Sequence, residues 1–319
     1  MELTSIKTKR TKYREFLGVY DVRNAYFDEL RKHNKTKKIY EVDPYAEVFK
    51  YRDNLYCILT ESLDGMGNPW SYLIVGPEKA MLIDTSFGLG NLKGLCDEIT
   101  GGMPLIVANT HWHFDHAYGN AQFDTVYCHE DEAANIEKTN NPHIWDYLFD
   151  ENGHGIWADF DPNDMIEYKK YQVIGVPDHY IFDLGEGYEV ELISLPGHTE
   201  GHCVYLDKHN HTLFGGDQTC LGGSIMLMGP QWVTKMRDHM KGIVDRIDEI
   251  EGVFPGHAFV DMDPQVLIDL YNTCCRAAEN IGSPDKKDAG TDWNGNPCWH
   301  CGERYEDWGY ITWNEERAR

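Results

Sequence analysis

The sequence lacks three features that would each define a class of protein. No apolar run approaches ~18 residues, so no segment is predicted to span a membrane. The nine cysteines are odd in number and scattered, and no apolar signal core follows Met1, which together favour reduced thiols and a cytoplasmic protein. Basic residues are also scarce, since 29 Lys and Arg face 53 Asp and Glu. The resulting net charge of −24 disfavours nucleic-acid binding.

The length of 319 residues and the hydrophobic content of 41% predict one large domain with extensions. We expect a helical basic extension at 1–45, a main domain at 46–282 and a tail rich in Trp and Cys at 283–319. Both extensions are expected to pack on the domain or across a contact in a homo-oligomer. In the tail, Cys298 and Cys301 could bind a structural metal with Cys274 or Cys275, although a single Cys-x-x-Cys is a weak signal.

The strongest chemical signal is the run from Thr110 to His116, which follows the apolar segment 104–108. His111 and His113 alternate, so on an extended backbone their rings point to the same side. Asp115 and His116 then fall on the following turn. Imidazoles and carboxylates suit zinc and related divalent ions such as iron or manganese. The run predicts a dinuclear metal site.

One short segment cannot complete two coordination spheres, so further ligands are expected downstream. Three candidates are His198, Asp217 and His257. Each follows a short strand-like run that ends in Gly or Pro-Gly. This recurrence indicates that the three residues stand at strand ends and share one site.

With these residues the chain resembles the metallo-β-lactamase-fold hydrolase superfamily, in its glyoxalase II or lactonase-like branch, from about Val48 to about Ile281. The matching motifs are His-x-His-x-Asp-His at 111–116, Gly-His-Thr at 197–199, Gly-Asp at 216–217 and Gly-His at 256–257. The resemblance implies an α/β fold of the αββα type, with two mixed sheets face to face and helices outside.

The resemblance also implies the ligand set of two metal ions, which we expect to be zinc. The first ion would take His111, His113 and His198, and the second Asp115, His116 and His257. Asp217 would bridge both ions, which argues against a β-lactamase because true β-lactamases of this fold lack that bridge. Asp84 would hold a ligand histidine in its orientation, and His202 would have a supporting role.

Two metal ions lower the pKa of a shared water from ~15.7 toward neutrality, so a bridging hydroxide is the expected nucleophile. Asp115 would orient it or carry a proton to the leaving group. The chemistry predicts hydrolysis of an ester, lactone or thioester of a small-molecule substrate. Cys220 stands where lactonases of this fold tend to carry tyrosine, and a basic C-terminal segment of the glyoxalase type is not recognisable. The first departure weakens the prediction of a lactonase, and the second weakens that of a glyoxalase II.

Alternatives to this function remain open. An iron-dependent oxidoreductase of the persulfide dioxygenase type uses a related ligand set on the same fold. A β-lactam-type amide hydrolase and a protein that binds metal without catalysis are two further possibilities.

The segment 129–180 is predicted to be an insertion that forms a lid over the site. Its aromatic residues would favour a hydrophobic or ring-bearing substrate. The predicted pocket residues are Trp145, Tyr147 and Trp157 from this segment, with Met226, Met228 and Trp232 from the stretch after Asp217. The alternative is that these aromatic residues form a small core or a subunit interface.

Overall fold

The computed structural model describes residues 12–13, 25–65, 67–220, 224–225, 230–291, 295–302 and 309–314. The chain divides into two compact units. The first consists of Met1–Cys128, Ala133–Ile174 and Leu184–Tyr188, and the second of His129–Glu132, Gly175–Asp183 and Glu189–Arg319.

The first unit is built on an eight-stranded sheet of order β10-β8-β7-β6-β5-β4-β3-β2. The strands from β3 to β6 pair antiparallel, whereas β6, β7 and β8 run parallel. Their bounds are β2 Lys38–Tyr40, β3 Asp43–Lys50, β4 Leu55–Leu59, β5 Trp70–Val75, β6 Ala80–Ile83, β7 Leu105–Ala108, β8 Thr125–His129 and β10 Gln172–Val176. The central strands carry continuous apolar runs, as expected of strands that are buried on both faces.

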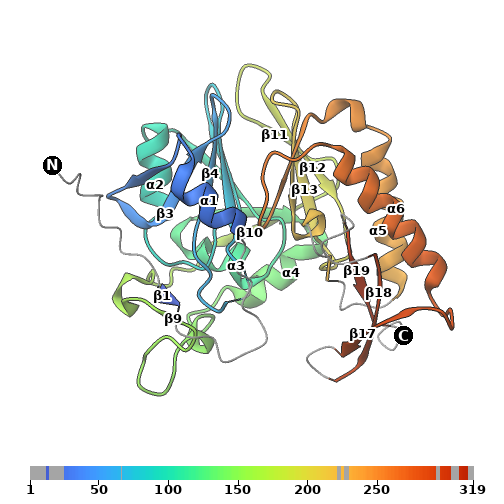
Figure 1. The fold of residues 1–319 in the computed structure, drawn as a ribbon. Helices are drawn as coiled ribbons and strands as arrows, with labels where there is room; N and C mark the ends of the chain where they lie inside the picture. The colour runs from blue at the N-terminus through green and yellow to red at the C-terminus, as the bar shows by residue number, and fades with distance from the viewer. Residues whose placement is uncertain are drawn as a thin grey trace. The chain divides into compact units, whose positions relative to one another are not determined.

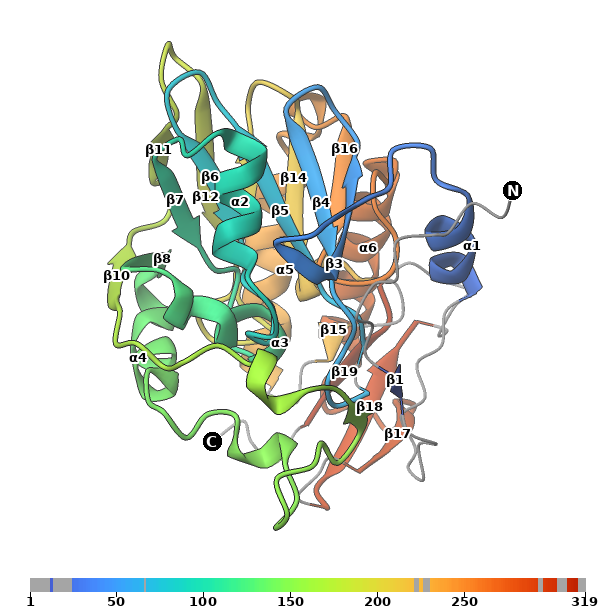
Figure 2. The same cartoon turned by 90° about the vertical axis from the view of Figure 1, so that its left-hand side faces the viewer.

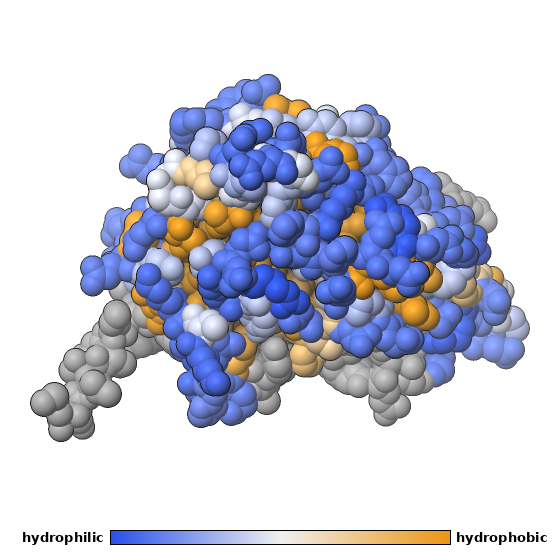
Figure 3. All heavy atoms as spheres, turned by 90° about the horizontal axis from the view of Figure 1, so that it is seen from above, coloured by the Kyte–Doolittle hydropathy of each residue, from blue (hydrophilic) through white to orange (hydrophobic). Residues whose placement is uncertain are grey.

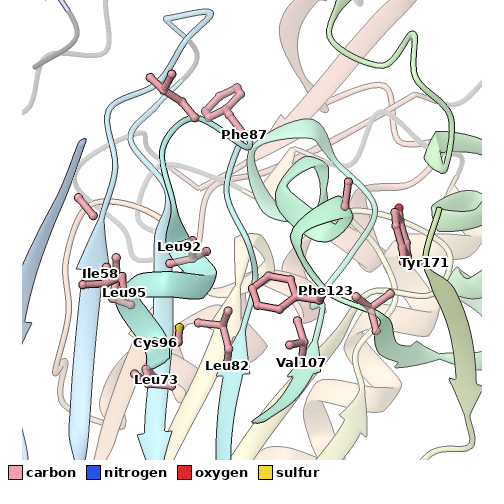
Figure 4. Packing of buried hydrophobic residues seen from close by; sticks show 14 of the residues in the cluster. Ile58, Leu73, Leu82, Phe87, Leu92, Leu95, Cys96, Val107, Phe123 and Tyr171 are labelled. Atoms are coloured by element: carbon pink, nitrogen blue, oxygen red, sulfur yellow. The ribbon is translucent and has the colours of Figure 1, made fainter. Parts of the chain in front are cut away.

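Helix α2 (Leu92–Thr100) lies over strands β5 and β6 of this sheet (Figure 2). Its buried residues Leu92, Leu95 and Cys96 point at Leu73 and Leu82 of these strands, and Figure 4 shows this packing. Asn91 caps the helix by accepting a hydrogen bond from the backbone of the first turn, and a left-handed glycine ends it. The first unit also contains α1 (Ala25–His33), α3 (Phe114–Ala117) and most of α4 (Glu130–Thr139), whose first three residues belong to the second unit.

The prediction of a helical extension at 1–45 holds for α1 but is wrong for residues 38–45. These residues form β2 and the beginning of β3, so a boundary at residue 45 would cut a strand of the sheet. Pro44 is the physical reason, because proline cannot continue a helix and the alternating residues around it fit an extended backbone. Arg31 of α1 forms ion pairs with Glu47 and Glu61, which tie the helix to this sheet.

The segment 129–180 is not simply an insertion, because Gln172–Val176 forms strand β10 at the edge of the sheet. Trp145 is 7% exposed, and its indole Nε1 donates to the carbonyl of Phe87 at 2.7 Å. Leu148 and Tyr171 join the same hydrophobic cluster. Much of this segment therefore completes the core of the first unit. A short strand, β9 (Ala158–Asp159), pairs with β1 (Lys12–Tyr13).

The second unit has a five-stranded sheet of order β11-β12-β13-β14-β16, in which β14 and β16 are parallel. The strands are β11 Ile181–Asp183, β12 Glu189–Ser194, β13 Cys203–Asp207, β14 Thr212–Gly216 and β16 Gly252–Pro255. Helices α5 (Pro230–Val244) and α6 (Gln265–Asn280) lie side by side (Figure 1). Their apolar faces and those of β12, β13, β14 and β16 share one cluster of buried side chains.

The tail contributes strands β17, β18 and β19 to a small sheet of the second unit, of order β15-β19-β18-β17, in which β15 comes from the stretch after Asp217. Its strands are β15 Ser224–Ile225, β17 Lys287–Thr291, β18 Pro297–Cys301 and β19 Ile311–Trp313. Trp313 is fully buried against the α5 and α6 cluster. Cys298 and Cys301 are three positions apart on one strand, so their side chains leave opposite faces. Among the described residues, no group of three metal-binding side chains includes either cysteine.

Hydrophilic residues dominate the face drawn in Figure 3, with apolar ones scattered among them. This distribution agrees with the high content of acidic residues. Within the described ranges, no helix combines the length and the apolar character that crossing a bilayer requires.

Candidate metal centre

The first unit places His111, His113, Asp115 and His116 at the carboxyl end of β7. His111 Nε2 lies 3.0 Å from His113 Nδ1, and His116 Nε2 lies 3.5 Å from Asp115 Oδ2. Two ligands on one tetrahedral zinc, at 2.0–2.1 Å from it, lie roughly 3.3 Å apart. His111 and His116 are fully buried. The separations and the donor types therefore fit a divalent cation.

Asp84 organises this cluster from the end of β6, the parallel neighbour of β7. Its Oδ1 accepts the backbone N–H of Thr110 at 2.7 Å, and its Oδ2 accepts the Thr110 hydroxyl at 2.8 Å. The same Oδ2 lies 2.9 Å from His116 Nδ1. An ionised carboxylate only accepts, so it selects the tautomer of His116 with the proton on Nδ1. The lone pair of Nε2 then points toward Asp115.

The turn that carries Asp115 and His116 is fixed to the strand ends by its backbone. The carbonyl of His116 accepts hydrogen bonds from the Thr85 backbone at 2.8 Å and from the Asn109 amide at 3.1 Å. Gly119 passes so close to the turn after β6 that an added Cβ would lie 2.0 Å from the Thr85 carbonyl oxygen. Glycine is therefore required sterically at this position.

Four partly buried aromatic residues surround the Asp115 turn. The ring of Tyr147 lies 5.9 Å from Phe114, 6.3 Å from Tyr118 and 6.0 Å from Trp157 between centroids. Burial, followed by the charges of Asp64 and Asp115, raises the pKa of Tyr147, so its hydroxyl stays protonated. Tyr147 and Trp157 were predicted as pocket residues from the sequence, whereas Phe114 and Tyr118 were not, although both lie within or beside the histidine motif.

The second unit brings His198, Asp217 and His257 together. Asp217 Oδ2 lies 3.4 Å from His198 Nε2, and Asp217 Oδ1 lies 3.3 Å from His257 Nε2. Because β14 and β16 are parallel and in register at Gly216 and Pro255, the residues that follow them meet at one edge. Each oxygen of a single carboxylate thus faces a different histidine, as a bridging ligand requires. These separations also match the distance of roughly 3.3 Å between two donor atoms that bind the same zinc ion.

The predicted supporting residue His202 and the remaining predicted pocket residues lie in different environments. His202 is fully buried, with its ring centroid 6.1 Å from that of His198. Trp232 is partly buried on α5, where Lys235 Nζ lies 4.1 Å from its ring centroid. Met226 and Met228 lie outside the described residues. Trp145 is a core residue rather than part of a pocket wall, because its ring is buried and its N–H is bonded within the first unit.

Cys220 lies shortly after Asp217 and is buried. Burial, followed by the charge of Asp217, raises the pKa of its thiol to about 12, so the thiol stays protonated at neutral pH. It donates to the carbonyl of Gly216 at 3.5 Å. It therefore lacks the properties of a nucleophile.

Known proteins are similar to this chain in sequence. Acyl-coenzyme A thioesterase MBLAC2 of Homo sapiens is 27% identical over 205 residues, which cover 58% of this chain and 71% of the relative. The protein of the same name from Gallus gallus is 25% identical over 207 residues, with the same shares covered. These relatives support a hydrolase, and the specific glyoxalase II or lactonase branch stays a prediction.

Solved structures agree at the level of the fold. A metallo-beta-lactamase from Pontibacter korlensis has a TM-score of 0.53 at 17% identity, covering 72% of this chain and 99% of its own. The DIM-1 metallo-beta-lactamase exposed to ceftazidime has a TM-score of 0.50 at 18% identity, covering 75% and 99%. The predicted fold class is confirmed. The family model described as the metallo-beta-lactamase superfamily matches residues 64–257, and with these motifs at its strand ends the chain belongs to that superfamily.

Proposed function

We propose that the chain is a metal-dependent thioesterase that hydrolyses thioesters of apolar acyl groups at a dinuclear zinc site. The observation that carries this proposal is the pair of ligand sets at strand ends, each with donor atoms separated as shared zinc ligands would be. The relatives named acyl-coenzyme A thioesterases favour a thioester over an ester, a lactone or a β-lactam.

The resemblance to the superfamily, whose match spans all seven proposed ligands, assigns them to two ions. His111, His113 and His198 would hold one ion, and Asp115, His116 and His257 the other. Asp217 would bridge the two. The donor set of imidazoles and carboxylates suits zinc, although iron and manganese accept the same ligands.

Bound zinc would supply two things, a lowered pKa for the attacking water and polarisation of the scissile carbonyl. The residues of the chain would orient the ligands and transfer the proton. Asp84 keeps the Nδ1 proton on His116, so that Nε2 keeps the lone pair that a metal needs. Asp115 has a carboxylate that can orient the attacking water and accept its proton. A thiolate leaving group needs little help from a general acid.

The aromatic residues Phe114, Tyr118, Tyr147 and Trp157 are the proposed wall for the acyl group. They are partly buried, and they surround the turn that carries Asp115. An acyl chain that covers them removes apolar surface from water, which is worth about 25 cal/mol for each Å². Trp145 supports this wall only indirectly, through the core.

The first experiment combines metal analysis with a substrate panel. Protein purified without added metal is analysed for zinc, iron and manganese, and is assayed with acyl thioesters, aryl esters, lactones and β-lactams. We expect two zinc ions per chain and the highest kcat/KM for thioesters with long acyl groups. One iron per chain with oxygen consumption would contradict the proposal, as would a preference for small polar acids or for β-lactams.

The leaving group is tested separately, because coenzyme A carries several negative charges and the chain has a net charge of −24. Long-range repulsion of this kind raises KM at low salt and is screened as salt increases. We therefore expect KM for an acyl-coenzyme A to fall as ionic strength rises, with little change for an uncharged thioester of the same acyl group. Equal salt dependence of both substrates would refute this electrostatic argument.

A further inference from the structure

The loop that carries His198 is held by a buried carboxylate that is not among the proposed ligands. Glu132, in the first turn of α4, is fully buried. Its Oε1 accepts the hydroxyl of Thr199 at 2.9 Å, and its Oε2 accepts the backbone N–H of Gly201 at 2.9 Å. Both oxygens of one carboxylate are thus bonded to residues within three positions of His198.

The backbone of this loop also lies directly against the backbone of α4. A Cβ added at Gly201 would lie 2.3 Å from the backbone nitrogen of Glu132 and 2.6 Å from the carbonyl carbon of Asp131. Only glycine permits this approach. The contact is independent of the two hydrogen bonds, and it fixes the same stretch of loop to the same helical turn.

A second restraint acts on His198 itself. Its backbone N–H donates to Oε1 of Gln218 at 2.7 Å, and the Gln218 amide lies 2.7 Å from the sulfur of Met236. Gln218 is fully buried and follows Asp217 directly. The loop of one proposed ligand is therefore bonded to the neighbour of another.

We propose that Glu132 is a positioning residue that fixes the His198 imidazole relative to Asp217 before metal binds. The inference rests on the proposed metal site. Burial of a carboxylate is costly unless its oxygens accept hydrogen bonds, and here both accept them from the loop that carries the ligand. Without Glu132 the loop gains freedom in the apo protein. Metal binding must then restore its order, and the affinity falls.

The test measures zinc affinity by competition with a chelator, together with the visible absorption spectrum of the cobalt-substituted protein. We expect E132A to weaken zinc binding by about 10-fold to 100-fold, the range for residues that orient metal ligands. T199V loses one of the two hydrogen bonds and should show a smaller effect. E132Q should bind almost as the unmodified chain does, because its amide oxygen can accept from Gly201 while its nitrogen donates to the Thr199 hydroxyl.

E130A is the matched control, because Glu130 lies in the same helical turn but is exposed. It removes the same charge and should leave the zinc affinity and the cobalt spectrum unchanged. A purely structural role of Glu132 predicts a lower melting temperature of the apo protein with an unchanged zinc affinity and cobalt spectrum, and that result would overturn the inference. If E132A does not fold, T199V decides the question, and wild-type zinc affinity in T199V would overturn it as well.

The variant H198A distinguishes a failure of the proposed metal site from a failure of the positioning role of Glu132. If H198A binds zinc as tightly as the unmodified chain, the proposed metal site itself is wrong. If H198A weakens binding while E132A does not, only the positioning role of Glu132 fails.

Discussion

The substitution D84N tests how the chain controls the protonation of a proposed ligand. Asp84 accepts from the backbone and the hydroxyl of Thr110 and from Nδ1 of His116, at 2.7, 2.8 and 2.9 Å. Its φ of 62° lies in the left-handed region. Asparagine adopts this conformation readily, so the substitution changes the hydrogen bonding with little strain on the backbone.

In D84N, the single amide oxygen can replace only one of the two carboxylate oxygens as a hydrogen-bond acceptor. If it accepts from the Thr110 backbone, the amide nitrogen faces the Nδ1–H of His116, and two donors oppose each other. The ring relieves this conflict by moving its proton to Nε2. A protonated Nε2 has no lone pair for a metal ion, so the variant must reverse the tautomer whenever it binds zinc.

We expect D84N to lower zinc affinity by about 10-fold to 100-fold, which corresponds to about 1.4 to 2.7 kcal/mol. Chelator competition measures the affinity, and calorimetry of the apo protein shows whether the fold is retained. D97N is the matched control, because it makes the same change of charge at an exposed residue paired with Lys93 on α2. Zinc binding by D84N within twofold of the unmodified chain, together with weak binding by H116A, would show that Asp84 does not control the His116 tautomer.

Three further outcomes are expected. D115A should reduce thioester hydrolysis by at least about 100-fold with little change in the urea midpoint, and a rate near wild type would contradict the role of Asp115. G119A places a Cβ 2.0 Å from the Thr85 carbonyl oxygen and should destabilise the fold by about 1 to 3 kcal/mol, so an unchanged urea midpoint would count against it. Burial raises the pKa of Glu191, but hydrogen bonds led by that from Arg246 outweigh it and lower the pKa to about 2. This stabilisation is present above pH 4.5 and is lost as the pH falls toward 2, so E191Q should flatten the dependence of the urea midpoint on pH in that window.

The positions of the proposed ligands could be predicted from the sequence because each lies on the segment that follows a short strand. Asp217 and His257 illustrate this, since both follow β-type runs that end in glycine or Pro-Gly, and these runs are parallel neighbours in the second unit. A short apolar run followed by glycine is a local signal. Parallel pairing then brings the strand ends to one edge without further information.

Residues whose role depends on distant partners were predicted less well. Trp145 was expected in a pocket wall, but its indole N–H is bonded to a backbone carbonyl 58 positions away in the sequence, and its ring is buried. Residues 38–45 were expected to be helical, yet β2 pairs with β3 through Lys38 with Val48 and Tyr40 with Asp43. Glu132 gave no signal at all, because it stands in an acidic helical turn whose other members are exposed. Only the fold shows which one is buried.

Buried residues hold the proposed ligands in place through hydrogen bonds, which is why residues distant in the sequence contribute to the site. Burial of imidazole and carboxylate groups 3.0 to 3.5 Å apart removes them from water, which is costly, so the fold must hold them in place through further contacts. Asp84 does so for His116, and Gln218 does so for the backbone of His198. Both restraining residues are fully or almost fully buried. Because they are fixed by the same strand ends and core that define the fold, the free energy of folding offsets the cost of assembling each ligand set before a metal binds.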